Sequence, residues 1–153
     1  MKLKEEMYVP LVTMRIVREK EIPYGTREID NPQKVVALVK ELLDGADKEL
    51  MIAISVDTKC KPVAVEVVAI GRLNQLATEP KDIFKHAILT NAYGIILVHN
   101  HPSGNPEPSE DDRKFTKIMK DVGEFLGVRL LDHLIIGEDN LYYSFGENEN
   151  KEK

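Results

Sequence analysis

The sequence predicts an α/β or α+β sandwich, in which helices cover a mixed β-sheet. Two observations predict this class. Nearly continuous apolar runs at Leu50–Val56 and Ile95–His99 are typical of strands buried on both faces. Segments 32–43 and 109–126 instead carry apolar residues at helical spacing. Because no internal repeat or low-complexity linker separates these segments, we expect one domain.

Two strands and a helix are expected to build the N-terminal half around the first buried run. Leu11–Val17 alternates loosely and contains several β-branched residues, which predicts a first strand. Asn31 followed by Pro32 is typical of a helix N-cap with proline at the first helical position. The buried run Leu50–Val56 is then expected to pair with Val63–Ile70 as a β-hairpin.

The C-terminal half predicts two helices and three strands. A capping sequence at Thr78–Pro80 begins the first helix, and Gly94 precedes the strand Ile95–His99. Strands at Arg129–Ile136 and Leu141–Phe145 follow, around a turn at residues 137–140. The expected core faces of the two helices are Ile83, Phe84, Ala87 and Ile88 in the first, and Phe115, Ile118, Met119, Val122, Phe125 and Leu126 in the second.

Size and composition bound the class of protein. The chain has 153 residues and a net charge of −5, which disfavours a protein whose main task is to bind the nucleic acid backbone. Cys60 is the only cysteine, which excludes an internal disulfide and a structural zinc cage of several thiolates. Without a signal-peptide pattern or a membrane-spanning apolar run, we expect a cytoplasmic protein with no membrane partner.

Several side chains that can bind a metal or take part in catalysis lie where the second buried strand meets the helix 109–126. Residues two apart in a strand point to the same face, so His99 and His101 can aim their imidazoles at one point. If Ser109 caps the helix, Asp112 lies in its first turn and is the natural third ligand. Two imidazoles and a carboxylate with an open fourth position are typical of a catalytic zinc site.

A hydrolase that activates water also needs a proton shuttle. Glu49, just ahead of the buried strand Leu50–Val56, is the candidate general base. Ser109 is placed to hydrogen-bond the oxyanion of a tetrahedral intermediate. Other glutamates remain open as the base, namely Glu41, Glu66, Glu79 and Glu107.

Each of these residues also has a purely structural interpretation. Ser109 followed by acidic residues fits an ordinary helix N-cap. A His-x-His pair at a strand end is by itself often unrelated to metal binding. His86 and His133 are expected to be surface histidines or hydrogen-bonded core histidines. The coincidence of two histidines, a serine and an aspartate at one junction favours the metal site.

The spacing of these residues resembles the signature of a known family. His99-x-His101, seven residues and then Ser109-x-x-Asp112 is similar to the signature of the JAMM metalloproteases, also called the MPN-plus or JAB domain family. The wider sequence resembles the bacterial RadC-like branch of that family. The segments that carry this likeness are His99–Gly104, Pro108–Ser109, Leu130–Gly137 and Tyr143–Phe145.

The resemblance implies a fold and a domain organisation. The fold is a three-layer α-β-α sandwich with a mixed sheet, related in shape to cytidine deaminases. The RadC-like JAB domain would occupy residues 31–147, between an N-terminal extension at 1–30 and a disordered tail at 148–153.

The resemblance also implies an activity and its residues. His99, His101 and Asp112 would bind Zn²⁺, Glu49 would be the general base, and Ser109 would stabilise the oxyanion. The substrate would be a peptide or protein, cut by a peptidase or isopeptidase. Eukaryotic deubiquitinases usually carry serine or threonine where Asn100 stands here, which argues against a ubiquitin-type substrate.

Two further functions were weighed against a metallohydrolase. A non-catalytic RadC-like module could act in DNA repair or recombination through protein contacts, but the complete ligand set favours catalysis. The helix-hairpin-helix region of full-length RadC-like proteins does not fit before Asn31, which further disfavours direct nucleic-acid binding. A nucleobase deaminase needs a Pro-Cys-x-x-Cys zinc arm that a lone Cys60 cannot supply. Leu11–Val17 or a sheet edge is a candidate contact for a homodimer.

Overall fold

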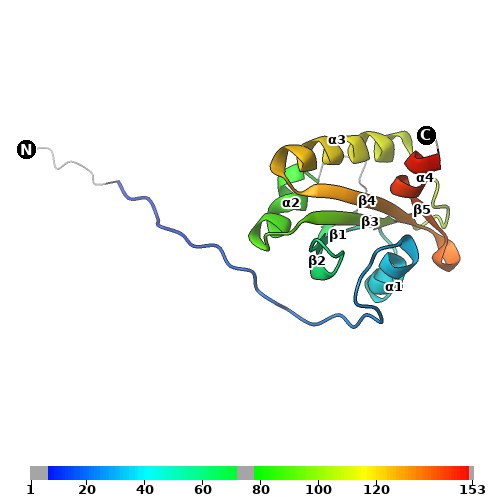
Figure 1. The fold of residues 1–153 in the computed structure, drawn as a ribbon, viewed down its shortest axis with the longest axis horizontal. Coiled ribbons are helices and arrows are strands. Elements are labelled where there is room, and N and C mark those ends of the chain that lie inside the picture. Colours follow the sequence, from blue (N-terminus) through cyan, green and yellow to red (C-terminus); the bar gives the residue numbers. More distant parts are fainter. Residues whose placement is uncertain (1–6, 72–77, 152–153) are drawn as a thin grey trace, which may run out of the picture.

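The computed structural model describes residues 7–71 and 78–151, and it has an α/β fold built on a mixed five-stranded sheet. Helices lie on both faces of this sheet (Figure 1). The strands are β1 (Leu50–Val56), β2 (Pro62–Ile70), β3 (Gly94–Asn100), β4 (Arg129–Ile136) and β5 (Tyr142–Ser144). The α-helices are α1 (Pro32–Leu43), α2 (Pro80–Leu89), α3 (Glu110–Leu126) and α4 (Phe145–Lys151). None of the helices in the described ranges has the length and apolar character that crossing a bilayer requires.

The strand order is β2-β1-β3-β4-β5, so β3 lies at the centre of the sheet. It pairs antiparallel with β1 and parallel with β4, while the outer pairs β1–β2 and β4–β5 are antiparallel. Every residue of β3 is buried, as its continuous apolar run predicts. The predicted hairpin of β1 with β2 is also confirmed.

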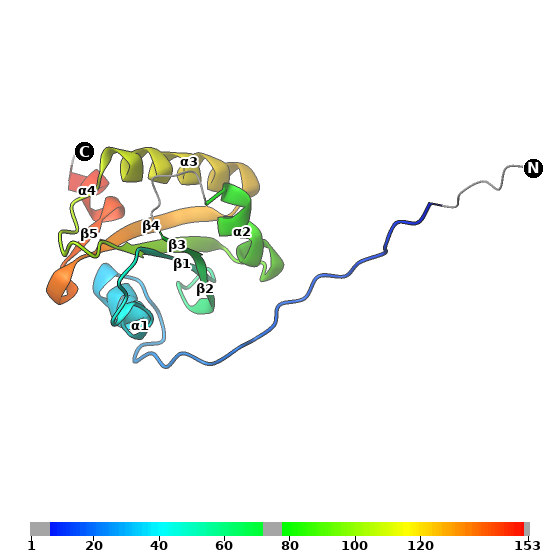
Figure 2. The ribbon, with the colours of Figure 1, turned by 180° about the vertical axis from the view of Figure 1, so that it is seen from behind.

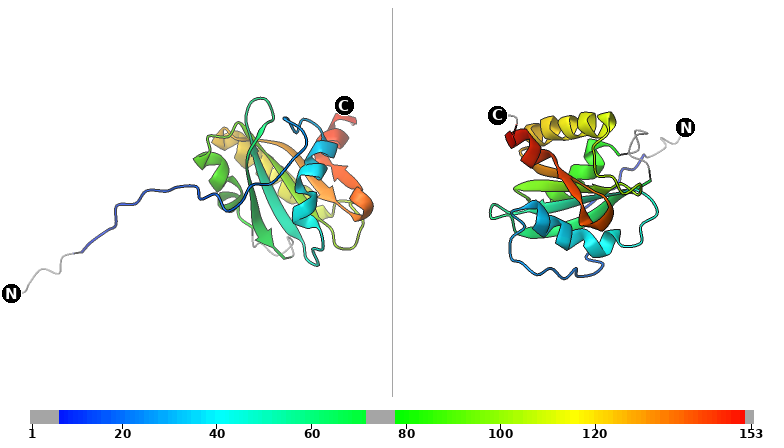
Figure 3. Two further views of the ribbon diagram at one scale, coloured as in Figure 1. Left: turned by 90° about the horizontal axis from the view of Figure 1, so that it is seen from below. Right: turned by 90° about the vertical axis from the view of Figure 1, so that its right-hand side faces the viewer.

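Side-chain alternation along β1 divides the core into two halves. Ile52 and Ile54 pack with α1 on one face, whereas Met51 and Ala53 pack with residues of α2 and α3 on the other. Viewed end-on, α3 lies above the sheet and α1 lies below it (Figure 3). The polar end of β3 therefore opens on the face that α3 covers.

The prediction of an N-terminal strand at Leu11–Val17 is wrong. Between residues 7 and 31 the structure contains no helix or strand, and the chain runs away from the domain as an extended arm (Figure 2). The side chains of Leu11 and Val17 are fully or largely exposed. The arm joins the domain at Ile29, which is buried and whose N–H donates to the Cys60 carbonyl at 2.9 Å. Residues Leu11–Val17 do have strand propensity, but a strand also needs a neighbouring strand to pair with.

Two details of the helices differ from the sequence prediction. Four residues expected on the core faces are exposed instead, namely Ile88 (52%), Ile118 (52%), Phe125 (90%) and Leu126 (41%). His86 takes an inward position on α2. At the C-terminus, α4 is helical through Lys151, where the sequence predicted a disordered tail from residue 148. Residues 152 and 153 of that predicted tail, and residues 1–6 of the predicted N-terminal extension, lie outside the described residues.

The loop that follows β3 is held against the end of β4. The His101 N–H donates to the Ile136 carbonyl at 2.8 Å, and the Glu138 N–H donates to the Gly104 carbonyl at the same distance. Gly104 has a φ of +89°, which favours glycine. A Cβ on Gly137 would lie 2.2 Å from the Gly104 carbonyl oxygen, so only a glycine allows this approach.

We predict that Gly137→Ala destabilises the fold by about 1–3 kcal/mol, because its Cβ would push against backbone that cannot move aside cheaply. Denaturant unfolding followed by circular dichroism measures this change. Gly25→Ala is the matched control, since a Cβ there meets no atom within 4 Å. Equal stability of the two variants would contradict the close packing described here.

Candidate metal centre

The two histidines of the junction converge at the end of β3. His99 is fully buried in the strand, and His101 follows directly after it, with its side chain 15% exposed. Their Nε2 atoms lie 3.1 Å apart. The prediction that these imidazoles aim at one point is therefore confirmed.

Asp112 reaches the same point from the first turn of α3. Ser109 is the N-cap of α3, as predicted, and its Oγ accepts from the Asp112 N–H at 3.1 Å. In return, Asp112 Oδ2 accepts from the Ser109 N–H at 2.8 Å, which completes a capping box. The box holds the carboxylate against the start of the helix and turned toward the end of β3.

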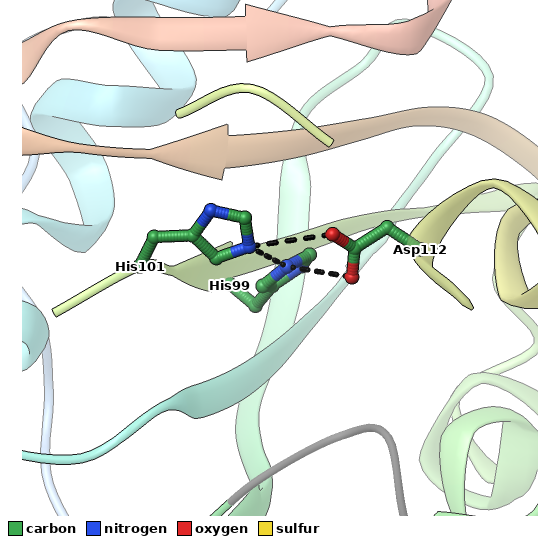
Figure 4. A group of neighbouring side chains, drawn as sticks. All are labelled: His99, His101 and Asp112. Atoms are coloured by element: carbon green, nitrogen blue, oxygen red, sulfur yellow. Dashed lines mark hydrogen bonds and ion pairs between the residues drawn. The ribbon is translucent and has the colours of Figure 1, made fainter. Parts of the chain in front are cut away.

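The three side chains have the spacing that a tetrahedral zinc site needs. His99 Nε2 lies 3.2 Å from Asp112 Oδ1, and His101 Nε2 lies 3.3 Å from Asp112 Oδ2 (Figure 4). With zinc bonds of about 2.0–2.1 Å, neighbouring ligand atoms of a tetrahedron lie about 3.3 Å apart. The donor atoms of this group all lie within 4.8 Å of one another, so the residues fit a metal ion.

The surroundings keep the Asp112 carboxylate charged and the ring of the neighbouring His133 neutral. Burial raises the pKa of Asp112, but the neighbouring His99, together with the capping bonds of Ser109, holds this pKa well below its usual range. Burial and the neighbouring His99 lower the pKa of His133, which is fully buried beside it. Asp112 thus presents an anionic oxygen, the form of a carboxylate that binds a metal ion.

His99 and His101, the two candidate ligands, are each held by their second ring nitrogen. His101 Nδ1 lies 2.8 Å from the Asn105 carbonyl oxygen, which can only accept, so Nδ1 carries the proton. His99 Nδ1 lies 2.7 Å from Nε2 of His133. Partners of this kind fix the orientation of a metal ligand and raise its affinity.

Glu49 lies on the rim of the same site. In the register between β1 and β3, Met51 is opposite His99, so continuing by two residues brings Glu49 opposite His101. Glu49 and Ser109 line one cleft with His101 and Asp112. Of the glutamates considered as the base, Glu49 is the one that lines this cleft, and Glu41, Glu66, Glu79 and Glu107 do not.

Comparison with known proteins fits this geometry. A family model described as RadC-like JAB domain matches residues 29–151. The chain belongs to this RadC-like JAB domain family. The match spans both ligand histidines, the capping serine and Asp112, so the predicted family is confirmed.

The chain is also similar to several curated proteins named UPF0758 proteins. A UPF0758 protein of Desulfitobacterium hafniense is 41% identical over 119 residues, which covers 78% of this chain and 52% of the relative. One from Desulforamulus reducens is 43% identical over 119 residues (77% and 52%), and one from Enterococcus faecalis is 38% identical over 133 residues (87% and 56%). The chain therefore spans about half the length of the curated relatives it matches.

The cleft of the JAB domain has an acidic lining. Glu49, Asp111 and Asp112 contribute carboxylates, and Phe115 contributes an apolar wall. Neither lysine nor arginine occurs among the described residues that line it. This charge disfavours a phosphodiester backbone as the bound ligand and suits a neutral or cationic chain.

Asn100, between the two ligand histidines, clamps the backbone on both sides of Glu49. Its side-chain oxygen accepts from the Leu50 N–H at 2.7 Å, and its amide group donates to the Lys48 carbonyl at 3.1 Å. The side chain is 8% exposed, so these bonds are shielded from water. The clamp extends the pairing of β1 with β3 and thereby places Glu49 at the cleft.

Two residues near the site, Asn100 and His133, take roles that depend on tertiary contact. No local pattern indicates a structural role for Asn100. His133 is a hydrogen-bonded core histidine, as expected, but its contact with His99 was not predicted. His86 is buried on α2, with its Nδ1 3.1 Å from Glu66 Oε2. His133 instead touches a ligand. One signal was available: His133 lies in a predicted strand that could neighbour the strand of His99.

We predict that Asn100→Ala destabilises the domain by about 1–3 kcal/mol, because it leaves two buried backbone groups without their partner. Amide hydrogen exchange should show faster exchange at Leu50, whose N–H loses its acceptor. Asn148→Ala is the matched control, since it removes a side-chain bond from α4 to the carbonyl of Ser144 at the end of β5. Unchanged exchange at Leu50 in Asn100→Ala would argue against the clamp.

Proposed function

We propose that this RadC-like JAB domain is a zinc-dependent metallohydrolase that cleaves a peptide or isopeptide bond. The observation that carries the proposal is the convergence of two imidazoles and one carboxylate at the cleft that Glu49 and Ser109 also line. Three protein ligands leave the fourth position of a tetrahedral zinc open, as in catalytic sites.

The bound zinc would polarise the substrate carbonyl and lower the pKa of water to about 7. Glu49, at the rim of the cleft, accepts the proton of the attacking water and passes it to the leaving amine. The oxygen of the attacking water forms the new C–O bond first, which places negative charge on the carbonyl oxygen. The C–N bond then breaks as the amine takes up the proton, and the products are a carboxylate and an amine.

Ser109 is suited to stabilise the oxyanion. Its Oγ already accepts the Asp112 N–H, so its own hydroxyl proton remains available to donate into the cleft. The start of α3 adds the partial positive charge of a helix N-terminus. Both contributions favour the negative charge that develops on the carbonyl oxygen.

Other features support the same proposal. Helices on both faces of the sheet support the three-layer α-β-α arrangement related in shape to cytidine deaminases. The single cysteine suits the reducing cytoplasm where we propose that the protein works. A non-catalytic role in DNA repair or recombination, through protein contacts, is the alternative that the next two experiments separate.

We predict about one zinc ion per chain, with a strong loss of bound zinc in His99→Ala and in Asp112→Ala. Elemental analysis after dialysis measures the stoichiometry. His86→Ala is the matched control, because it removes a buried histidine from the far part of α2. A parent protein that holds no zinc after reconstitution at neutral pH, or a His99→Ala variant that retains it fully, would exclude this metal site.

We predict that Glu49→Gln retains zinc but loses hydrolysis by about 10²–10⁴-fold, because the amide cannot accept the proton of water. A panel of peptides and lysine-linked isopeptides supplies the assay. Glu107→Gln is the matched control, since Glu107 lies in the loop before α3, does not line the cleft and pairs with Arg113 at 3.5 Å. Zinc-loaded parent protein that cleaves no member of the panel would favour the non-catalytic alternative.

A further inference from the structure

A line of buried hydrogen bonds runs from His99 away from the ligand cluster. His99 Nδ1 lies 2.7 Å from His133 Nε2, and His133 Nδ1 lies 2.7 Å from Thr116 Oγ1. The Thr116 hydroxyl in turn donates to the Asp112 carbonyl oxygen at 2.7 Å. Both His99 and His133 are fully buried, and Thr116 is 2% exposed. The line therefore starts at one ligand, passes through β4 and ends on the backbone of another.

The protons of this line can be assigned from the partners alone. A backbone carbonyl has no proton, so the one proton of the Thr116 hydroxyl goes to Asp112. Thr116 Oγ1 must then accept from His133, which places the proton of that ring on Nδ1. His133 Nε2 is left as an acceptor, and His99 Nδ1 is the donor that faces it. The proton of His99 is then on Nδ1, and its Nε2 lone pair faces the cluster.

We propose that His133 and Thr116 are positioning residues that hold His99 in the one tautomer able to bind the metal. The inference rests on the proposed zinc site. The same line ties Asp112 on α3 to His99 on β3, so it also sets the distance between two ligands that come from different elements. Both His133 and Thr116 lie outside the His-x-His and Ser-x-x-Asp pattern, so the sequence pattern does not indicate this role.

Packing alone does not explain His133. Its ring stacks on Phe145, with centroids 5.1 Å apart and an angle of 11° between the planes. A phenylalanine at position 133 would keep this stacking and lose both hydrogen bonds. Because a buried histidine without partners is costly, a residue needed only for packing would more simply be apolar.

The first test reads the tautomers directly. Ring ¹⁵N chemical shifts distinguish the two tautomers of a neutral histidine, and coupling across an N–H···N bond identifies its two partners. We expect His133 in the Nδ1–H form, coupled through Nε2 to the Nδ1–H of His99, both before and after zinc is added. A proton on Nε2 of His133 would overturn the proposal.

The second test removes the hydroxyl group of Thr116 while it keeps the shape of the side chain. Thr116→Val keeps the shape of the side chain but cannot accept from His133, so His133 is free to place its proton against His99. We expect zinc affinity, measured by competition with a chelator, to fall by about 10- to 100-fold in Thr116→Val and in His133→Phe. Thr116→Ser keeps the hydroxyl and should bind zinc as the parent does.

The outcomes distinguish this inference from the proposed function. A parent protein that never holds zinc refutes the zinc site, and the ring tautomers of the metal-free protein still test the hydrogen-bond line. A parent that binds zinc, with Thr116→Val equally tight, refutes the positioning role and leaves the zinc site intact. His86→Phe controls for the general cost of replacing a buried histidine, since His86 lies on α2 outside the cluster.

Discussion

The structure depends on one constraint at the end of β3: a fully buried strand must end in polar side chains without leaving them unpartnered. Burying a polar ring costs about 1–3 kcal/mol unless it is hydrogen-bonded. His99 meets this constraint through His133, and Asn100 meets it through the backbone on either side of Glu49. The partners of these buried groups are thus the same residues that shape the site, so stability and site geometry are not separable here.

The first turn of α3 carries two tasks at once. Asp112 completes the capping box with Ser109 and also turns both carboxylate oxygens toward the histidines. A cap alone would account for its presence, and the sequence could not decide between cap and ligand. The structure shows that the two roles are compatible, because capping fixes the carboxylate at the position from which it faces His99 and His101.

Most of the fold was predictable because its elements carry local signals. Continuous apolar runs predict the buried strands β1 and β3, and Asn31 followed by Pro32 predicts the start of α1. The arm at Leu11–Val17 shows the limit of such signals, since alternation reports strand propensity but not whether a neighbouring strand exists.

The candidate site divides in the same way. His99, His101 and Asp112 lie within 14 residues of one another, and their spacing was enough to predict that they meet. Asn100 acts on a segment some 50 residues away, and His133 lies 34 residues from His99. Their roles depend on the register of β3 with β1 and β4, which no local pattern specifies.

The charge around the start of α3 argues for the kind of ligand that the cleft accepts. Glu110 and Asp111 are exposed acidic residues in the first turn, and Asp111 lines the cleft together with Glu49 and Asp112. The helix N-terminus supplies positive potential only over its first turn, and the Asp112 carboxylate already lies in that turn. A bound metal cation would compensate the buried carboxylate, whereas the rim carboxylates would remain to attract positive charge. The acidic rim therefore favours a ligand that carries positive charge and disfavours a polyanion.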